Sequence, residues 1–201
     1  MKTSDFIACQ KFPCQDTASK NYLVPEIEIS PEKIWMVMIS ESAPADRKDY
    51  FYSGVDALFA QTTLLAFQDA GVKASSIQEL VDRGIYFTTA IKCSKTGYGI
   101  QTSTIQACSR LLEKELNLFP NAKVFMLMGD VAIKSLNTIA RRAGEKAPIP
   151  VGSTYKIRGQ EYFWHLRRVF PSYPQAGLSF FIEKSKRRMI AEDITAAMKL
   201  L

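Results

Sequence analysis

The sequence lacks any long hydrophobic run. It contains no stretch of eighteen or more apolar residues, and its first residues, MKTSDFIACQKF, have no apolar core like that of a signal peptide. A membrane span, a membrane partner and a secretory leader are therefore not expected, and the cytoplasm is the expected location. Internal repeats are absent as well. With 47% hydrophobic and 23% charged residues, the composition is that of one globular domain spanning residues 1–201.

Cysteine is scarce, and its four occurrences form two separated pairs. Cys9 and Cys14 lie near the N-terminus, whereas Cys93 follows a predicted strand and Cys108 lies in the predicted helix after it. In a reducing compartment such residues are more often free thiols or metal ligands than disulfides. Four thiolates are sufficient for a [4Fe–4S] cluster or a tetrahedral zinc ion. The alternative is four unrelated cysteines with Cys108 in the core, because free cysteine is commonly buried.

Acidic residues are sparse in the C-terminal third. Between Arg141 and Arg188 the sequence has eleven Lys and Arg residues and three acids, a net charge of +8 in a chain of net charge +6. A basic segment suits a polyanionic partner such as nucleic acid, since each neutralised phosphate releases counterions. The alternative interpretation is a solvated basic surface without a partner.

The hydrophobic pattern alternates between strands and helices. Short segments rich in β-branched and aromatic residues predict buried strands at Ile34–Ile39, Ile85–Ile91, Lys123–Met128 and Tyr162–Phe170. Helical periodicity predicts helices at Val55–Ala70, Ser103–Leu118, from about Asp130, and from about Glu183 to the C-terminus. Within the second helix, Glu115 is expected to point away from the apolar face. The expected fold class is α/β, a monomeric three-layer α/β/α sandwich with a central, mostly parallel four-stranded sheet.

The connections after the predicted strands are where a ligand is expected. Ligands of open parallel sheets bind beyond the carboxyl ends of the strands. The loops concerned start at Ser40, Lys92, Gly129 and Pro171. The segment Arg141–Gln160, rich in Gly, Pro and charge, predicts a further loop, with a short hairpin near Thr154–Tyr162.

Four sequence motifs, taken in order, are similar to those of one known family. TTAIKCSKTGYGIQTSTIQACSRLLEKEL (Thr88–Leu116) is similar to its T-N-V-V-K-C…C-x-x-x-L stretch, and NAKVFMLMGDVAIKSL to its strand–Leu–Gly–x–x–Ala–helix segment. ESAPADRKDYFYSG (Glu41–Gly54) occupies the place of G-E-A-P-G…P-F-V-G, and FPSY (Phe170–Tyr173) that of H-P-S. The order holds from residue 9 to about residue 175. Over this length the chain resembles the uracil-DNA glycosylase superfamily, especially its iron–sulfur members.

The resemblance implies a role in base excision. It implies a protein that binds DNA rather than RNA, flips a damaged base into a pocket and cleaves the N-glycosidic bond with water. The implied ligands of a [4Fe–4S] cluster are Cys9, Cys14, Cys93 and Cys108. The implied base-binding residues are Ala43, Pro44, Tyr52 and Thr89. The implied nucleic-acid-binding residues are Arg167, Arg168, Phe170, Pro171, Ser172 and Tyr173.

The reaction-centre residues of the family are substituted in this chain. The family's acidic residue corresponds to Ser42, whose hydroxyl cannot act as a carboxylate base. Its base-reading asparagine corresponds to Thr89, and its histidine corresponds to Phe170, which offers no hydrogen bond to a departing base. His165, the only histidine, precedes Phe170 by five residues, or about 16 Å of extended strand. We therefore interpret His165 as structural.

Two candidate catalytic residues remain, Ser42 and Asp46, and Glu41 is a further acid whose direction the sequence does not determine. Tyr52 corresponds to the aromatic residue on which the flipped base stacks, although it is equally consistent with a core or rim aromatic. One candidate function is a uracil-DNA glycosylase-like protein that binds nucleic acid or a flipped base and cleaves its glycosidic bond. Another is a non-catalytic nucleic-acid- or nucleotide-binding module that retains the fold. A third is an enzyme of changed specificity.

Overall fold

A six-stranded sheet forms the centre of the computed structural model, which describes residues 1–201. The strands are β1 (Thr17–Ala18), β2 (Met36–Ala43), β3 (Ile85–Lys95), β4 (Val124–Met128), β5 (Tyr162–Trp164) and β6 (Arg167–Ser172). Their spatial order is β1-β3-β2-β4-β6-β5. The inner strands β3, β2, β4 and β6 pair in parallel, and both edge strands pair antiparallel to their neighbours. The expected parallel core of the sheet is confirmed, but the sheet has six strands rather than four.

Burial explains why the inner strands were predictable and the edge strands were not. The side chains of residues 36–39 in β2 and 124–128 in β4 are enclosed on both faces, and such burial produces continuous apolar runs. β1 is too short for a pattern, and β5 is separated from β6 by a turn. In this turn His165 and Leu166 adopt positive φ angles of 47° and 65°. The segment predicted as one strand is therefore a hairpin.

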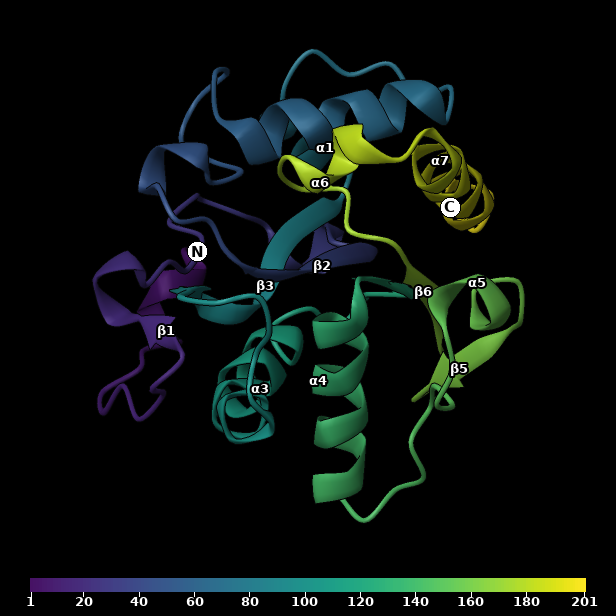
Figure 1. Cartoon of the computed structure of the whole chain (residues 1–201). Coiled ribbons are helices and arrows are strands. Elements are labelled where there is room, and N and C mark those ends of the chain that lie inside the picture. The colour runs from purple at the N-terminus through teal and green to yellow at the C-terminus, as the bar shows by residue number, and fades with distance from the viewer.

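Helices cover both faces of the sheet. They are α1 (Leu58–Asp69), α2 (Ile77–Asp82), α3 (Thr102–Leu116), α4 (Asp130–Arg142), α5 (Thr154–Ile157), α6 (Ser179–Ile182) and α7 (Lys184–Met198). Figure 1 shows α1, α6 and α7 on one side of the sheet and α3 and α4 on the other. The three-layer architecture is thus confirmed. The short helices α2, α5 and α6 were not predicted, and α5 lies where a hairpin was expected.

The parallel strands bring distant loops to one edge of the molecule. A cluster of 44 buried hydrophobic residues fills the space between the sheet and the helices. Because β2, β3, β4 and β6 run in the same direction, the segments that follow them start at the same edge. The pairing of β2 with β3 shifts register between Ser42 and Ala43, where the partner changes from Ile91 to Ser94. No helix of the structure combines the length and the apolar character that crossing a bilayer requires.

Candidate functional site

A cavity of about 830 Å³ lies at the carboxyl edge of the sheet. Its wall consists of residues 40–45 at the end of β2, residues 94–98 after β3, residues 174, 176, 178 and 179 after β6, and Phe59 from α1. We call it the Ser42 cavity. Its position beyond the carboxyl ends of parallel strands is where open α/β sheets bind ligands.

Three of the predicted site residues meet in the Ser42 cavity. Ser42, Ala43 and Pro44 all line it, at the end of β2. Ser40, two residues earlier, also lines it, and its hydroxyl donates to the Oε1 atom of the fully buried Gln175 at 3.1 Å. The motif that carried the resemblance therefore forms one wall of a real cavity.

Glu41 is the acid that the structure adds to this wall. It lines the Ser42 cavity, and its Oε1 atom accepts a hydrogen bond of 3.3 Å from the backbone N–H of Val131, in the first turn of α4. A Cβ atom on Gly129 would lie 2.5 Å from the same Oε1 atom, so the glycine leaves room for the carboxylate. The amino end of a helix favours a negative charge. The sequence indicated an acid here but not its direction.

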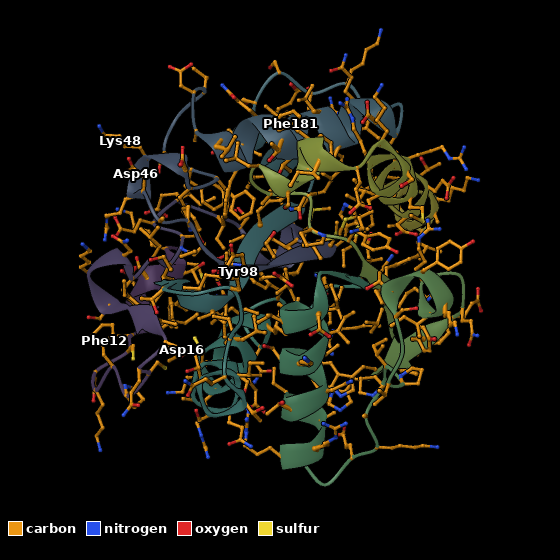
Figure 2. The ribbon with its side chains drawn as sticks, viewed as in Figure 1. Phe12, Asp16, Asp46, Lys48, Tyr98 and Phe181 are labelled. Atoms are coloured by element: carbon orange, nitrogen blue, oxygen red, sulfur yellow. The ribbon has the colours of Figure 1, made fainter.

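Asp46, the other candidate acid, lies outside the Ser42 cavity. Its side chain is exposed, and its carboxylate accepts the backbone N–H of Lys48 at 2.9 Å, which caps the 3-10 helix Arg47–Asp49. Figure 2 shows Asp46 and Lys48 together at the periphery. Its observed contact is therefore that of a helix cap.

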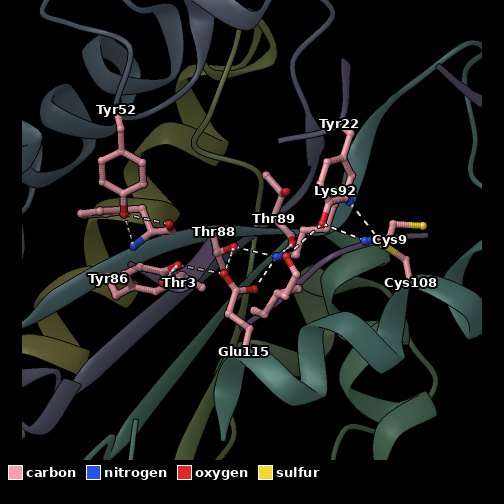
Figure 3. Close-up of polar contacts among 12 residues, drawn as sticks. Thr3, Cys9, Tyr22, Tyr52, Tyr86, Thr88, Thr89, Lys92, Cys108 and Glu115 are labelled. Carbon is pink, nitrogen blue, oxygen red and sulfur yellow. Dashed lines mark hydrogen bonds and ion pairs between the residues drawn. The ribbon is translucent and has the colours of Figure 1, made fainter. Parts of the chain in front are cut away.

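Tyr52 is turned away from the Ser42 cavity. Its hydroxyl donates to the carbonyl of Phe87 at 2.8 Å and accepts the N–H of Phe87 at 3.0 Å (Figure 3). Its ring lines a separate cavity of about 170 Å³ together with Phe51 and Gly54. Burial raises the pKa of Tyr52 well above its ordinary value. The structure thus does not bring Tyr52 together with Ser42.

Thr89 is fully buried and borders neither of these cavities. Its hydroxyl has no hydrogen-bond partner, and neither does the buried hydroxyl of Tyr50. Burial raises the pKa of Tyr50 well above its ordinary value. Polar atoms of both residues are therefore enclosed, and neither is exposed to a ligand in the Ser42 cavity.

A buried ion pair lies on the opposite face of β3. Lys92 and Glu115 are both fully enclosed, and the Lys92 ammonium donates to the Glu115 carboxylate and to the Thr88 hydroxyl. The hydroxyls of Tyr86 and Thr88 donate to Glu115 at 2.8 and 2.9 Å (Figure 3). The prediction that Glu115 points away from the apolar face of α3 is wrong, because these donors satisfy its carboxylate inside the protein.

The F-P-S-Y segment is mostly part of the sheet. Phe170, Pro171 and Ser172 are buried residues of β6, and the Ser172 hydroxyl donates to Asp193 of α7 at 2.5 Å. Tyr173 follows the strand, and the Lys186 ammonium lies 5.4 Å from the centre of its ring. Of the four residues, only Tyr173 therefore lies in a loop after the strand.

Arg167 and Arg168 lie at the opposite end of β6. They begin the strand, so they are at the amino edge of the parallel sheet, away from the Ser42 cavity. The Arg167 guanidinium lies 5.6 Å from the ring centre of Phe125, and that of Arg168 lies 4.3 Å from that of Phe170. These contacts pack the arginines onto the protein, and their predicted binding of nucleic acid stays a prediction.

The four cysteines line one cavity of about 660 Å³ near the N-terminus, which we call the cysteine cavity. Cys93 and Cys108 are buried, whereas Cys9 and Cys14 are half-buried. The backbone N–H of Lys92 donates to the Cys108 Sγ atom at 3.3 Å. Burial and the neighbouring thiols raise the pKa of Cys93 to about 12, and burial raises that of Cys108 to about 11. The topology thus brings two pairs that are remote in sequence to one place.

Four thiols are the potential ligands that the cysteine cavity offers. No three His, Cys, Asp or Glu side chains are arranged as ligands of one metal ion. A four-iron cluster occupies a volume rather than a point, and its ligands are four thiolates. The four thiols match this ligand set. The only carboxylate or imidazole on the same wall is the carboxylate of Glu113.

Asp16 attaches the segment that carries Cys9 and Cys14 to α3. Its carboxylate accepts the backbone N–H of Gln101 at 2.6 Å and the hydroxyl of Thr104, both at the amino end of α3. Its carbonyl accepts the N–H of Thr96 at 3.0 Å. Side-chain capping of a helix from a distant segment both stabilises the helix and fixes that segment.

Comparison with known proteins finds a family match over most of the chain. Residues 33–196 match the family model described as Uracil DNA glycosylase superfamily. A Type-5 uracil-DNA glycosylase of Thermus thermophilus is 25% identical over 117 residues, which are 58% of this chain and 51% of that protein. The match therefore spans about half the length of this curated relative. Because the family model covers most of the chain, including the Ser42 cavity, the chain belongs to the uracil-DNA glycosylase superfamily.

Proposed function

We propose that this protein binds DNA and receives an unstacked base in the Ser42 cavity. The observation that carries the proposal is the cavity itself, which the motif residues Ser42, Ala43 and Pro44 line at the carboxyl edge of the sheet. Membership of the superfamily supports DNA rather than RNA as the partner. The net charge of +6 favours a polyanion, because neutralised phosphates release counterions.

The proposal includes hydrolysis of the N-glycosidic bond, with Glu41 as the acting carboxylate. Glu41 is the only acidic residue that lines the Ser42 cavity. In the proposed step, water attacks the sugar carbon, the base departs with the electrons of the carbon–nitrogen bond, and the water loses a proton to Glu41. The departing base takes up a proton from solvent. A positioned carboxylate of this kind contributes about 10²–10⁴-fold to such reactions.

The second candidate function is a binding module without catalysis. The observation that favours it is the position of Thr89 and Phe170, which are both buried outside the Ser42 cavity. The family has an asparagine and a histidine at these two positions. In this chain neither position supplies a hydrogen bond to a base in the Ser42 cavity. A module of this kind would bind unstacked bases and leave the glycosidic bond intact.

One experiment separates the two functions. Purified protein is incubated with single- and double-stranded oligonucleotides that carry one uracil, its binding is measured by fluorescence anisotropy, and abasic sites are then cleaved with alkali. We expect strand scission by the wild type, a loss of at least about 100-fold in Glu41→Gln, and no loss in the control Asp46→Asn. Glutamine can still accept the Val131 N–H, so the fold is preserved. Binding without scission in the wild type would establish the module instead.

We further propose that Cys9, Cys14, Cys93 and Cys108 hold a [4Fe–4S] cluster in the cysteine cavity. The four thiols on one cavity wall support this, because cysteines in a reducing compartment remain free to bind a metal. When bound, the cluster supplies a rigid crosslink between the N-terminal segment, β3 and α3. The chain's own residues contribute the N–H of Lys92 near the Cys108 sulfur and the attachment at Asp16.

A further inference from the structure

Tyr98 is a fully exposed aromatic residue on the rim of the Ser42 cavity. Its relative exposure is 104%, and it lines the cavity from the loop between β3 and α3. Figure 2 shows Tyr98 close to the end of β3, near the centre of the view. No ring of another residue stacks on it, and no cation lies over it. Its ring therefore has both faces free.

The other aromatic residues near the cavity are already occupied. Phe59 lines the cavity, but its ring packs on that of Phe51 with 5.3 Å between the ring centres. Tyr52 is held by two hydrogen bonds to the backbone of Phe87. Tyr98 is thus the one tyrosine or tryptophan on the cavity wall, and its ring makes no packing contribution to the core.

Two glycines give the Tyr98 loop conformational freedom. Gly97 and Gly99 flank Tyr98, neither has a positive φ, and a Cβ atom on either would meet nothing within 4 Å. Neither backbone geometry nor crowding therefore requires glycine at these positions. What glycine adds here is a wider range of backbone angles. Glycine on both sides therefore allows the Tyr98 ring a wider range of orientations at the rim of the cavity.

The surroundings of Tyr98 suit a nucleotide. Lys95 lines the same cavity, and its ammonium donates to the Tyr98 carbonyl at 3.4 Å. On the facing segment after β6, Leu178 lines the cavity with 70% of its surface exposed. A flat apolar ring, an aliphatic side chain and a cation around one opening match the π-face of a base and the charge of its phosphate.

We infer that Tyr98 stacks on the base that enters the Ser42 cavity, and that Lys95 contacts an adjacent phosphate. This inference rests on the proposed function and assigns the stacking role to a residue that the resemblance does not indicate. The ligand is an unpaired nucleotide of single-stranded DNA. Every base has a π-face, so the contact tolerates different bases.

Fluorescence anisotropy of a labelled single-stranded oligonucleotide tests the inference. We expect Tyr98→Ala to raise the Kd about 5- to 150-fold, the equivalent of roughly 1–3 kcal/mol per stacked base. Tyr98→Phe and Tyr98→Trp keep a ring and should bind like the wild type. The matched control is Tyr155→Ala, because Tyr155 is 71% exposed on α5 and does not line the cavity. Lys95→Ala should reduce the dependence of the Kd on salt.

An oligonucleotide of the same length made of abasic nucleotides isolates the stacking contact. It retains the phosphates but offers no base, so Tyr98→Ala and the wild type should bind it equally. An equal loss on both probes, or a Kd of Tyr98→Ala equal to that of Tyr155→Ala, would overturn the inference and leave the proposed function intact. If the wild type bound neither the base-containing nor the abasic oligonucleotide, the proposed function itself would be overturned.

Discussion

At the scale of single residues, the charges of Lys92 and Glu115 depend on each other because both side chains are buried. Both are fully enclosed, and each satisfies the other together with the hydroxyls of Thr88 and Tyr86. Removing one partner leaves an uncompensated charge in the interior, which typically costs about 3–5 kcal/mol. We expect Lys92→Met and Glu115→Leu each to lower the free energy of unfolding by this amount, as measured by urea denaturation.

The double variant is the control for this ion pair. Lys92→Met with Glu115→Leu removes both charges and should recover most of the stability lost in either single variant, since apolar replacements of buried ion pairs are often neutral. Arg83 and Glu79 form an exposed pair of the same kind, and Arg83→Met should change stability by less than about 1 kcal/mol. Additive losses in the double variant would contradict a mutually compensating pair.

Residue types alone did not determine which aromatic and polar groups face the ligand cavity. Tyr52 occupies the place of the family's stacking residue, yet its hydroxyl bonds to the backbone of Phe87. Phenylalanine cannot form these bonds, so the hydroxyl itself supplies a reason for the inward position. Tyr98 carried no periodic or motif signal. Its only signal was an aromatic residue between two glycines in a loop after a strand.

At the scale of elements, two-sided burial made the parallel strands predictable. Continuous apolar runs define β2, β3 and β4 within a few residues. The β5–β6 hairpin was missed because two residues without glycine, His165 and Leu166, form its turn. Because of this turn, Arg167 and Arg168 begin β6 at the edge of the sheet opposite the Ser42 cavity. The edge of the sheet at which a residue lies depends on where its strand starts, and no glycine or proline marks that point between residues 161 and 170.

Asp16 connects the N-terminal segment to α3, so its replacement should weaken both the helix and the attachment of the segment. Asp16→Ala removes the acceptor for the Gln101 N–H and the Thr104 hydroxyl at the start of α3. We expect a loss of about 0.5–2 kcal/mol, as for other helix caps, and faster proteolytic cleavage within residues 1–20. The control is Asp5→Ala, because Asp5 is exposed and makes no side-chain contact of this kind. Unchanged proteolysis in Asp16→Ala would contradict the anchoring role.

At the scale of the whole molecule, motif order was more informative than any single motif. Four weak matches in sequence indicated the superfamily, and the family model over residues 33–196 shows it. The three-layer fold followed from alternating strands and helices. The residues that line the site could not be predicted in this way. Glu41 lies in β2, whereas Tyr98 and Leu178 lie in the segments after β3 and β6, and the parallel topology brings the three together. Their meeting is a property of the fold and not of any local pattern.

The proposed cluster tests how the molecule is held together as a whole. Anaerobically prepared protein should be brown, absorb broadly in the visible blue, bleach on reduction and contain about four irons per chain. Removing the iron with a chelator should lower the melting temperature and expose the N-terminal segment to protease, because ligands from residues 9 and 14 would no longer be tied to β3 and α3. Cys93→Ala should reproduce both effects without chelator. Before chelation, the wild type should therefore have a higher melting temperature and more resistance to protease than Cys93→Ala. After the iron is removed, the two proteins should have the same melting temperature and protease sensitivity. Iron-free anaerobic protein, or a stability indifferent to the chelator, would show instead that the four cysteines pack as ordinary thiols.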